Sequence, residues 1–154
     1  SNLVTTSERF DFIPADSRLV ANFAVEALSK VLSELPKSYD VVILDLPGSL
    51  SQPLSMALSV SQLVVVPVRN NLHSFRGYLQ IKSISAGVEV KALAIGTNVL
   101  IAEAELIDEP LLESSELEAS AATKVSILTH DKASESAESF RNVGYSILEK
   151  LGLE

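Results

Sequence analysis

The sequence of 154 residues contains no cysteine and no tryptophan. Without cysteine there is no disulfide framework, no thiolate nucleophile and no zinc–thiolate site. Long apolar stretches are missing too, because the longest run, residues 63–68, is far too short to cross a bilayer. No positively charged leader with an apolar core and a cleavage site is visible. The sequence therefore predicts a cytoplasmic protein without a transmembrane segment.

Positive charge is scarce in this chain. Twelve Lys and Arg residues stand against 20 Asp and Glu residues, and the formal net charge is −8. This balance argues against a surface that binds nucleic-acid phosphates over its whole extent, while a local basic patch stays open. Arg69, Arg76 and Lys82 are the candidates for such a patch near one end of the predicted sheet, with scattered surface charges as the alternative interpretation.

Patterns of metal ligands and of serine hydrolases are also absent. His73 and His130 are the only histidines and show no metal-ligand spacing, which favours loop or solvated positions. The acidic run 103–118 lacks the calcium-loop pattern and is interpreted as a solvated helical face. Ser49 follows Gly48, but the second glycine of a G-x-S-x-G nucleophile elbow is missing. Ser49 is therefore interpreted as part of a helix-capping turn.

What the sequence does contain is a regular order of elements. Short apolar blocks alternate with longer segments of helical period, and hairpin signals are almost absent. This order predicts an α/β fold in one domain, residues 1–154, with a mainly parallel sheet covered by helices on both faces. The predicted strands lie at 10–13, 40–45, 63–68, 90–95 and 125–128. The predicted helices run from Asp16 or Ser17 to Leu35 and at about 52–61, 73–85, 103–120 and 133–151, the last capped by Asp131. For 103–123, a helix pair or a mobile surface segment are the alternatives.

The segment 38–50 carries the clearest chemical signal. Its apolar run ends in Asp45, and Pro47 and Gly48 follow. P-loop nucleotidases present their Mg²⁺-organising aspartate in this way, because the carboxyl end of a parallel strand faces the ligand crevice. One carboxylate is enough there, since Mg²⁺ keeps most of its waters and substrate phosphates as ligands. The alternative is that Asp45 only caps the turn that leaves the strand.

Five segments, in the same order along the chain, resemble the ParA/MinD family of deviant Walker-type P-loop ATPases. Residues 39–49 resemble the family's YDxxxxDxPPS segment, with Gly48 in place of the second proline. The other four segments are 10–15, 57–68, 92–99 and 125–150. The resemblance implies a P-loop NTPase-like fold, binding of ATP and Mg²⁺, and a homodimer that works with a partner protein in plasmid partition, chromosome segregation or another positioning system.

The resemblance also implies roles for single residues. Asp45 would be the Walker B aspartate, the catalytic residue that holds the metal ion through water. Asn98 would contact the adenine. Pro47, Asn70 and His73 would lie against the nucleotide. Members of the family that bind DNA non-specifically carry basic residues on the closing helix, where this chain has only Lys132, Arg141 and Lys150, so DNA binding is doubtful.

The phosphate loop with which the family opens is absent. None of the six glycines is followed by lysine, and none cluster. Because phosphate binding in this fold needs backbone N–H groups in a tight glycine-rich loop, we expect this chain alone to bind no ATP. The favoured interpretation is the C-terminal portion of a longer ATPase that lacks the P-loop strand here. A degenerate relative with a rebuilt sheet, or a partner copy that covers the strand at 40–45, are the alternatives.

Two functions follow from these observations. The first is a ParA/MinD-like ATPase module whose dimer switches with the nucleotide, with hydrolysis itself an open question for this chain. The second is a non-catalytic adaptor of the same fold that serves polar localisation or assembly through protein–protein contacts. A bacterial tyrosine-kinase-like domain ranks last, because the three tyrosines are not clustered at the chain's end.

Overall fold

The computed structural model describes residues 3–8, 10–14, 24, 26–36, 38–48, 50–85, 87–96, 101–102 and 105–153. The chain divides into two compact units, Ser1–Val60 and Ser61–Glu154. Within the described parts of the chain, none of the helices has the length and apolar character needed to span a bilayer.

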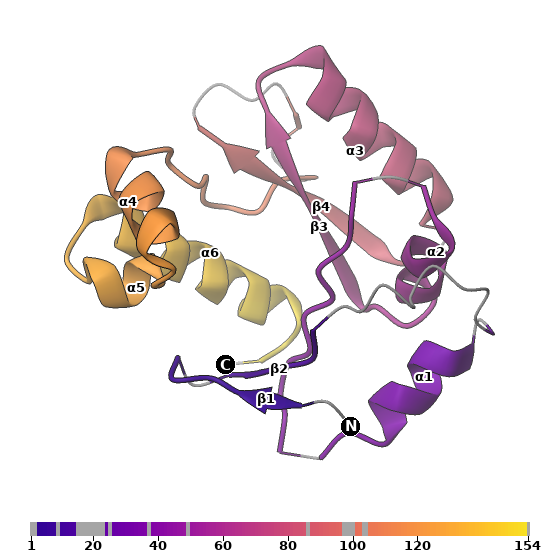
Figure 1. The fold of residues 1–154 in the computed structure, drawn as a ribbon. Coiled ribbons are helices and arrows are strands. Elements are labelled where there is room, and N and C mark those ends of the chain that lie inside the picture. Colours follow the sequence, from indigo (N-terminus) through magenta and orange to yellow (C-terminus); the bar gives the residue numbers. More distant parts are fainter. Residues whose placement is uncertain are drawn as a thin grey trace. The chain divides into compact units, whose positions relative to one another are not determined.

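The first unit contains a small hairpin and two helices (Figure 1). Strands β1 (Val4–Thr5) and β2 (Asp11–Phe12) pair antiparallel. Helices α1 (Glu26–Ser33) and α2 (Gln52–Leu58) follow. β2 confirms the core of the strand predicted at 10–13, and α1 confirms the second half of the first predicted helix. The predicted caps of that helix, Asp16 and Ser17, lie outside the described residues.

The prediction of a strand at 40–45 is wrong. Residues 41–47 form neither strand nor helix, and the side chain of Ile43 is 86% exposed. β-branched residues favour an extended backbone, but a strand exists only where its N–H and C=O groups meet those of a neighbour. Among the described residues, none pairs with this segment as a strand.

The second unit is built around a β-α-β motif. Strands β3 (Leu63–Arg69) and β4 (Glu89–Ile95) pair in parallel from Leu63↔Glu89 to Arg69↔Ile95. Helix α3 (Leu72–Ile84) connects them. The strands predicted at 63–68 and 90–95 and the helix predicted at 73–85 are therefore confirmed, and so is the expectation of parallel pairing for these two strands.

A third stretch of chain runs along the other edge of β4. Isolated parallel bridges join Ala92 to Leu106 and Ile95 to Leu111. We call residues 105–113 the edge segment. A helical stretch at about 103–120 was predicted here, with a helix pair or a mobile surface segment as the alternatives for 103–123. The helix is wrong for 106–114 and confirmed for 115–120. Pro110, which lacks an N–H group, cannot be accommodated in a helix interior.

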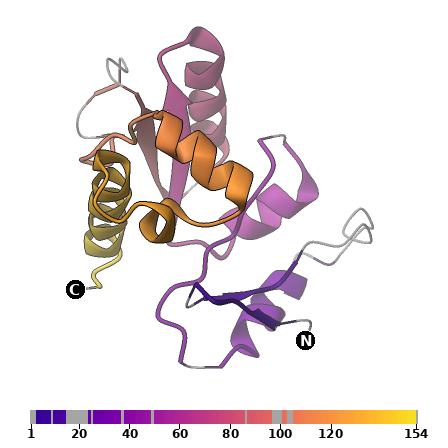
Figure 2. The ribbon, with the colours of Figure 1, turned by 60° about the vertical axis from the view of Figure 1, so that its left-hand side comes forward.

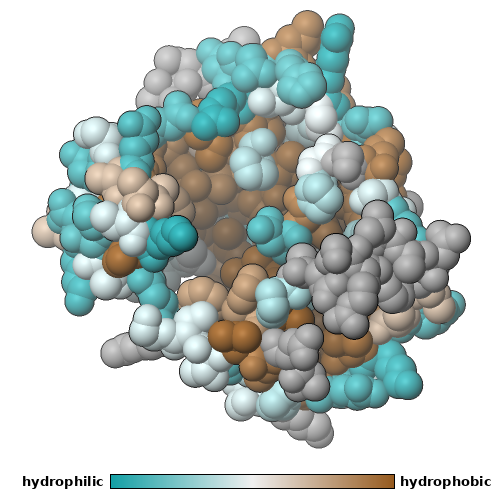
Figure 3. Space-filling view, in the orientation of Figure 1, coloured by the Kyte–Doolittle hydropathy of each residue, from teal (hydrophilic) through white to brown (hydrophobic). Residues whose placement is uncertain are grey.

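The β3–β4 sheet is covered on both faces, as the continuous apolar runs predict. On one face Tyr78 of α3 packs with Val68 and Ala92. On the other face Val143 of helix α6 (Glu135–Lys150) packs with Leu93. Figure 2 shows α3 and α6 on opposite sides of the strands. In the space-filling view, hydrophobic residues gather in the middle, over β3 and β4, with hydrophilic residues around them (Figure 3).

Serine residues set the boundaries of the last three helices. Ser114, Ser126 and Ser134 cap helices α4 (Ser115–Thr123), α5 (Ile127–His130) and α6, each accepting a backbone N–H bond. The strand predicted at 125–128 is therefore wrong, because the Ser126 cap starts a helical turn there. The cap predicted at Asp131 is wrong as well, because Ser134 takes that role.

Ser51 occupies the N-cap position of α2 without making a cap bond, and its hydroxyl is buried with no partner among the described residues. Ser134 accepts from the Ala137 N–H at 3.1 Å. Ser51→Ala should therefore change the free energy of unfolding by less than about 0.5 kcal/mol, while Ser134→Ala should cost about 0.5–2 kcal/mol. Urea denaturation compares the two variants, and equal losses would show that the Ser51 hydroxyl has a partner.

Candidate functional site

The carboxyl end of β3 turns directly into α3. The Asn71 N–H donates to the Arg69 carbonyl at 2.7 Å, and the Asn71 side chain accepts from the Ser74 N–H at 2.8 Å and so caps the helix. Asn70 and His73 are exposed on either side of this cap. A strand followed at once by a helix is the arrangement that places residues at the ligand-facing edge of an α/β sheet. Two of the predicted site residues therefore lie at such an edge.

An ion pair joins this edge to the start of α4. The Arg69 Nη2 and Nε atoms lie 2.6 and 3.0 Å from the same Oε1 atom of Glu113. Both side chains are more than half exposed, so water screens this pair. The next residue, Ser114, caps α4 and shares a 2.6 Å hydrogen bond with the Ser136 hydroxyl of α6. The end of β3 and the first turns of α4 and α6 thus meet at one place.

β4 ends at the same edge, because it runs parallel to β3 in the register Arg69↔Ile95. Gly96 follows with φ of 78°, a left-handed conformation that favours glycine. Its N–H donates to the Leu111 carbonyl at 2.8 Å. Asn98, the predicted adenine contact, lies two residues further on and outside the described residues.

Asp45 and Pro47 belong to the first unit, where both are exposed. Because residues 41–47 are not a strand, Asp45 does not stand at a strand's carboxyl end in this structure. The predicted site therefore has its residues in two units, Asp45 and Pro47 in one and Asn70 and His73 in the other. Neither unit contains the whole predicted set.

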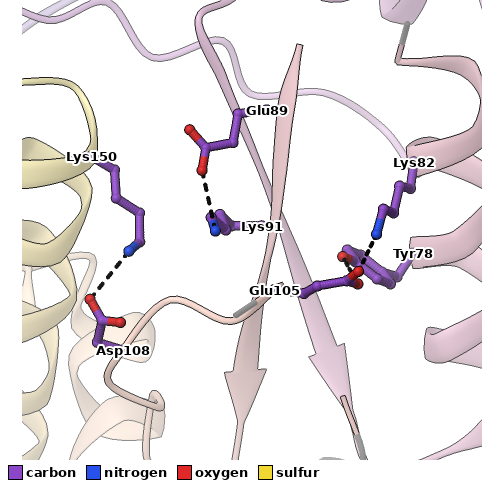
Figure 4. Close-up of polar contacts among 7 residues, drawn as sticks. All are labelled: Tyr78, Lys82, Glu89, Lys91, Glu105, Asp108 and Lys150. Carbon is purple, nitrogen blue, oxygen red and sulfur yellow. Dashed lines mark hydrogen bonds and ion pairs between the residues drawn. The ribbon is translucent and has the colours of Figure 1, made fainter. Parts of the chain in front are cut away.

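A polar cluster between α3 and the edge segment is a feature that the sequence analysis missed (Figure 4). The fully buried Tyr78 donates its hydroxyl to Glu105 at 2.7 Å. Lys82 forms an ion pair with the other oxygen of Glu105. Burial, followed by the bond to Glu105, raises the pKa of Tyr78. The bonds from Lys82 and then Tyr78 lower the pKa of Glu105.

Two ion pairs bear on the predicted basic patch, because they involve two of its residues, Arg69 and Lys82. Each of these two cations binds a carboxylate of the edge segment, Glu113 and Glu105 respectively. For Arg69 and Lys82 this pairing favours the interpretation as scattered surface charges. The described residues also contain no group of three or more His, Asp or Glu side chains placed to hold a metal ion.

Comparison with known proteins identifies the class. A family model described as an AAA domain matches residues 2–95. This match covers more than half of the sequence, so the chain belongs to that family, which is of the ParA/MinD type of P-loop ATPase. The resemblance seen in the sequence is therefore confirmed.

One curated relative illustrates the family. The chain is similar to a ParA family protein of Mycoplasma genitalium, with 27% identity over 89 residues. The alignment covers 51% of this chain and 32% of the relative, so the chain matches about a third of that protein's length. No solved structure matches.

Removing the Tyr78 hydroxyl tests the polar cluster. Tyr78→Phe keeps the buried ring but takes a donor from the Glu105 carboxylate, and should lower the free energy of unfolding by about 0.5–3 kcal/mol. Tyr145→Phe is the matched control, because Tyr145 is 68% exposed and should leave stability unchanged. Urea denaturation of both variants gives the comparison, and equal stabilities would contradict the role of the Tyr78–Glu105 bond.

The same cluster makes stability depend on pH. Because the pKa of Glu105 is lowered in the folded chain, its contribution is present above its ordinary pKa of 4.5 and is lost as the pH falls through the lowered value. Thermal melts below pH 4.5 should therefore show a weaker acid dependence for Glu105→Gln than for the wild type. Parallel curves for the two proteins would contradict this assignment.

Proposed function

We propose that this chain is a module of a ParA/MinD-like ATPase that switches between monomer and homodimer with its nucleotide. The proposal places the complete protein in plasmid partition, chromosome segregation or another spatial-positioning system, together with a partner protein. The family match over residues 2–95 carries the proposal. The β3-α3-β4 unit supports it, because its carboxyl edge presents Arg69, Asn70 and His73.

The proposed roles follow the family. Asp45 holds Mg²⁺ through water and organises hydrolysis, Pro47 shapes the turn after it, and Asn98 contacts the adenine. Asn70 and His73 lie against the nucleotide from the end of β3. The exposed positions of Asp45, Asn70 and His73 leave their polar groups accessible to a ligand.

The described residues do not fit the triphosphate. A phosphate loop needs clustered glycines followed by a lysine, and in this sequence no glycines cluster and none is followed by lysine. ATP binding is therefore proposed for the complete protein. A non-catalytic adaptor is the second candidate, because the missing phosphate loop favours it.

DNA binding is not part of the proposal. On the closing helix Lys150 lies 3.3 Å from Asp108, and the Arg141 guanidinium donates to the Lys132 carbonyl at 3.0 Å. These basic groups are engaged within the chain, and the net charge is −8. A surface that binds DNA phosphates needs several cations free to contact them.

The proposal is tested on the protein expressed from its complete reading frame. Light scattering should show a dimer with Mg-ATP and a monomer without nucleotide, and Asp45→Asn should abolish the ATP-dependent dimer. Asp40→Asn is the matched control, because it removes an exposed carboxylate five residues earlier. If the complete protein bound no nucleotide by calorimetry, the ATPase would be excluded and the adaptor would be left.

A further inference from the structure

The edge segment, residues 105–113, closes the outer edge of β4 with few backbone bonds. Ile107 and Leu111 donate to the carbonyls of Ala92 and Ala94, and Gly96 donates back to Leu111, each at 2.8 Å. On the other edge β4 pairs with β3 at seven successive residues. The two edges of β4 are therefore held very unequally.

Three ion pairs fasten the edge segment, each to a different element. Glu105 pairs with Lys82 of α3, and Asp108 with Lys150 of α6 at 3.3 Å (Figure 4). Glu113 pairs with Arg69 at the end of β3 at 2.6 Å. The pairs thus hold the segment at its beginning, its middle and its end.

The fourth carboxylate of the edge segment provides a contrast. Glu109 is exposed, and no ion pair within the described part of the chain involves it. Its charge is the same as that of its neighbour Asp108, but it does not fasten the segment to another element. Glu109 is therefore an internal reference for the effect of charge alone.

Apolar side chains of the edge segment pack against the two core clusters. Leu106 packs with the cluster under α3, while Ile107, which is 2% exposed, and Leu111 pack with the cluster under α6. The conformational entropy that a nine-residue segment without regular secondary structure loses on ordering opposes these contacts. Exposed ion pairs and a few hydrogen bonds offset only part of that entropy.

We propose that the edge segment is a strap that detaches from β4 as one unit while the rest of Ser61–Glu154 stays folded, and that its three ion pairs set how often this happens. Local opening of such contiguous units is a general property of folded chains. Detachment uncovers the backbone edge of β4 at Ala92 and Ala94. It also frees Arg69 beside Asn70 and His73. The proposal does not depend on the proposed function.

Amide hydrogen exchange of the full chain, followed by NMR, tests the strap. The Ile107 and Leu111 amides should exchange faster than the slowest amides of β3 and β4. The triple variant Glu105→Gln, Asp108→Asn, Glu113→Gln should speed the exchange of these two amides about 3- to 100-fold, because each exposed pair contributes modestly. The slowest amides of β3 and β4 should keep their rates.

Two controls separate fastening from general charge effects. Glu109→Gln removes one charge from the same segment and should change the exchange by less than about twofold. Raising the NaCl concentration from 0.05 to 1 M should speed the wild-type strap but not the triple variant, because salt screens exposed pairs.

Three results would overturn the proposal. The first is exchange of Ile107 and Leu111 at the rate of the slowest β3 and β4 amides, which would mean that the strap opens only with global unfolding. The second is an acceleration of Ile107 and Leu111 exchange by less than threefold in the triple variant, or an acceleration that Glu109→Gln alone reproduces. The third is an equal acceleration of the slowest β3 and β4 amides, which would assign the effect to global stability.

Discussion

The second unit depends on the enclosure of β4. β3 borders one edge of this strand and the edge segment borders the other, while α3 and α6 cover its two faces. A strand with neighbours in all four directions favours apolar side chains, and small ones where a helix packs closely. Ala92, fully buried in one cluster with Val68 and Tyr78, meets that requirement. The parallel register then brings Arg69 and Gly96 to the same edge.

The sequence predicts the two strands that are buried on both faces and the two helices that cover them. The runs at 63–68 and 90–95 are apolar except for Lys91, and α3 and α6 show a helical period. These local patterns are enough to identify the four elements. The run at 40–45 has the same composition, but pairing depends on a neighbour that local sequence does not reveal. At 125–128 four apolar and small residues fit either a strand or a helical turn, and the Ser126 cap decides for the helix. In the edge segment, Asp108, Glu109 and Pro110 interrupt the apolar pattern, so the sequence does not reveal that this segment runs along β4.

The candidate site could be predicted from the sequence only in part. Asn70 and His73 lie where a strand passes into a helix, and this order is visible in the sequence. Glu105 and Glu113 were not recognised as partners of Lys82 and Arg69, because ion pairs between residues 23 and 44 positions apart leave no local signal. Asp45 carries the family's sequence pattern without the strand that usually presents it.

The exposed run at 41–46 has a consequence for the protein in solution. Val42 and Ile43 expose their side chains here, and within the described part of the chain the backbone of this run pairs with no strand. When two molecules meet at this run, they gain apolar burial and strand pairing in a single encounter. An encounter of this kind needs two molecules, so its rate rises with the square of the protein concentration.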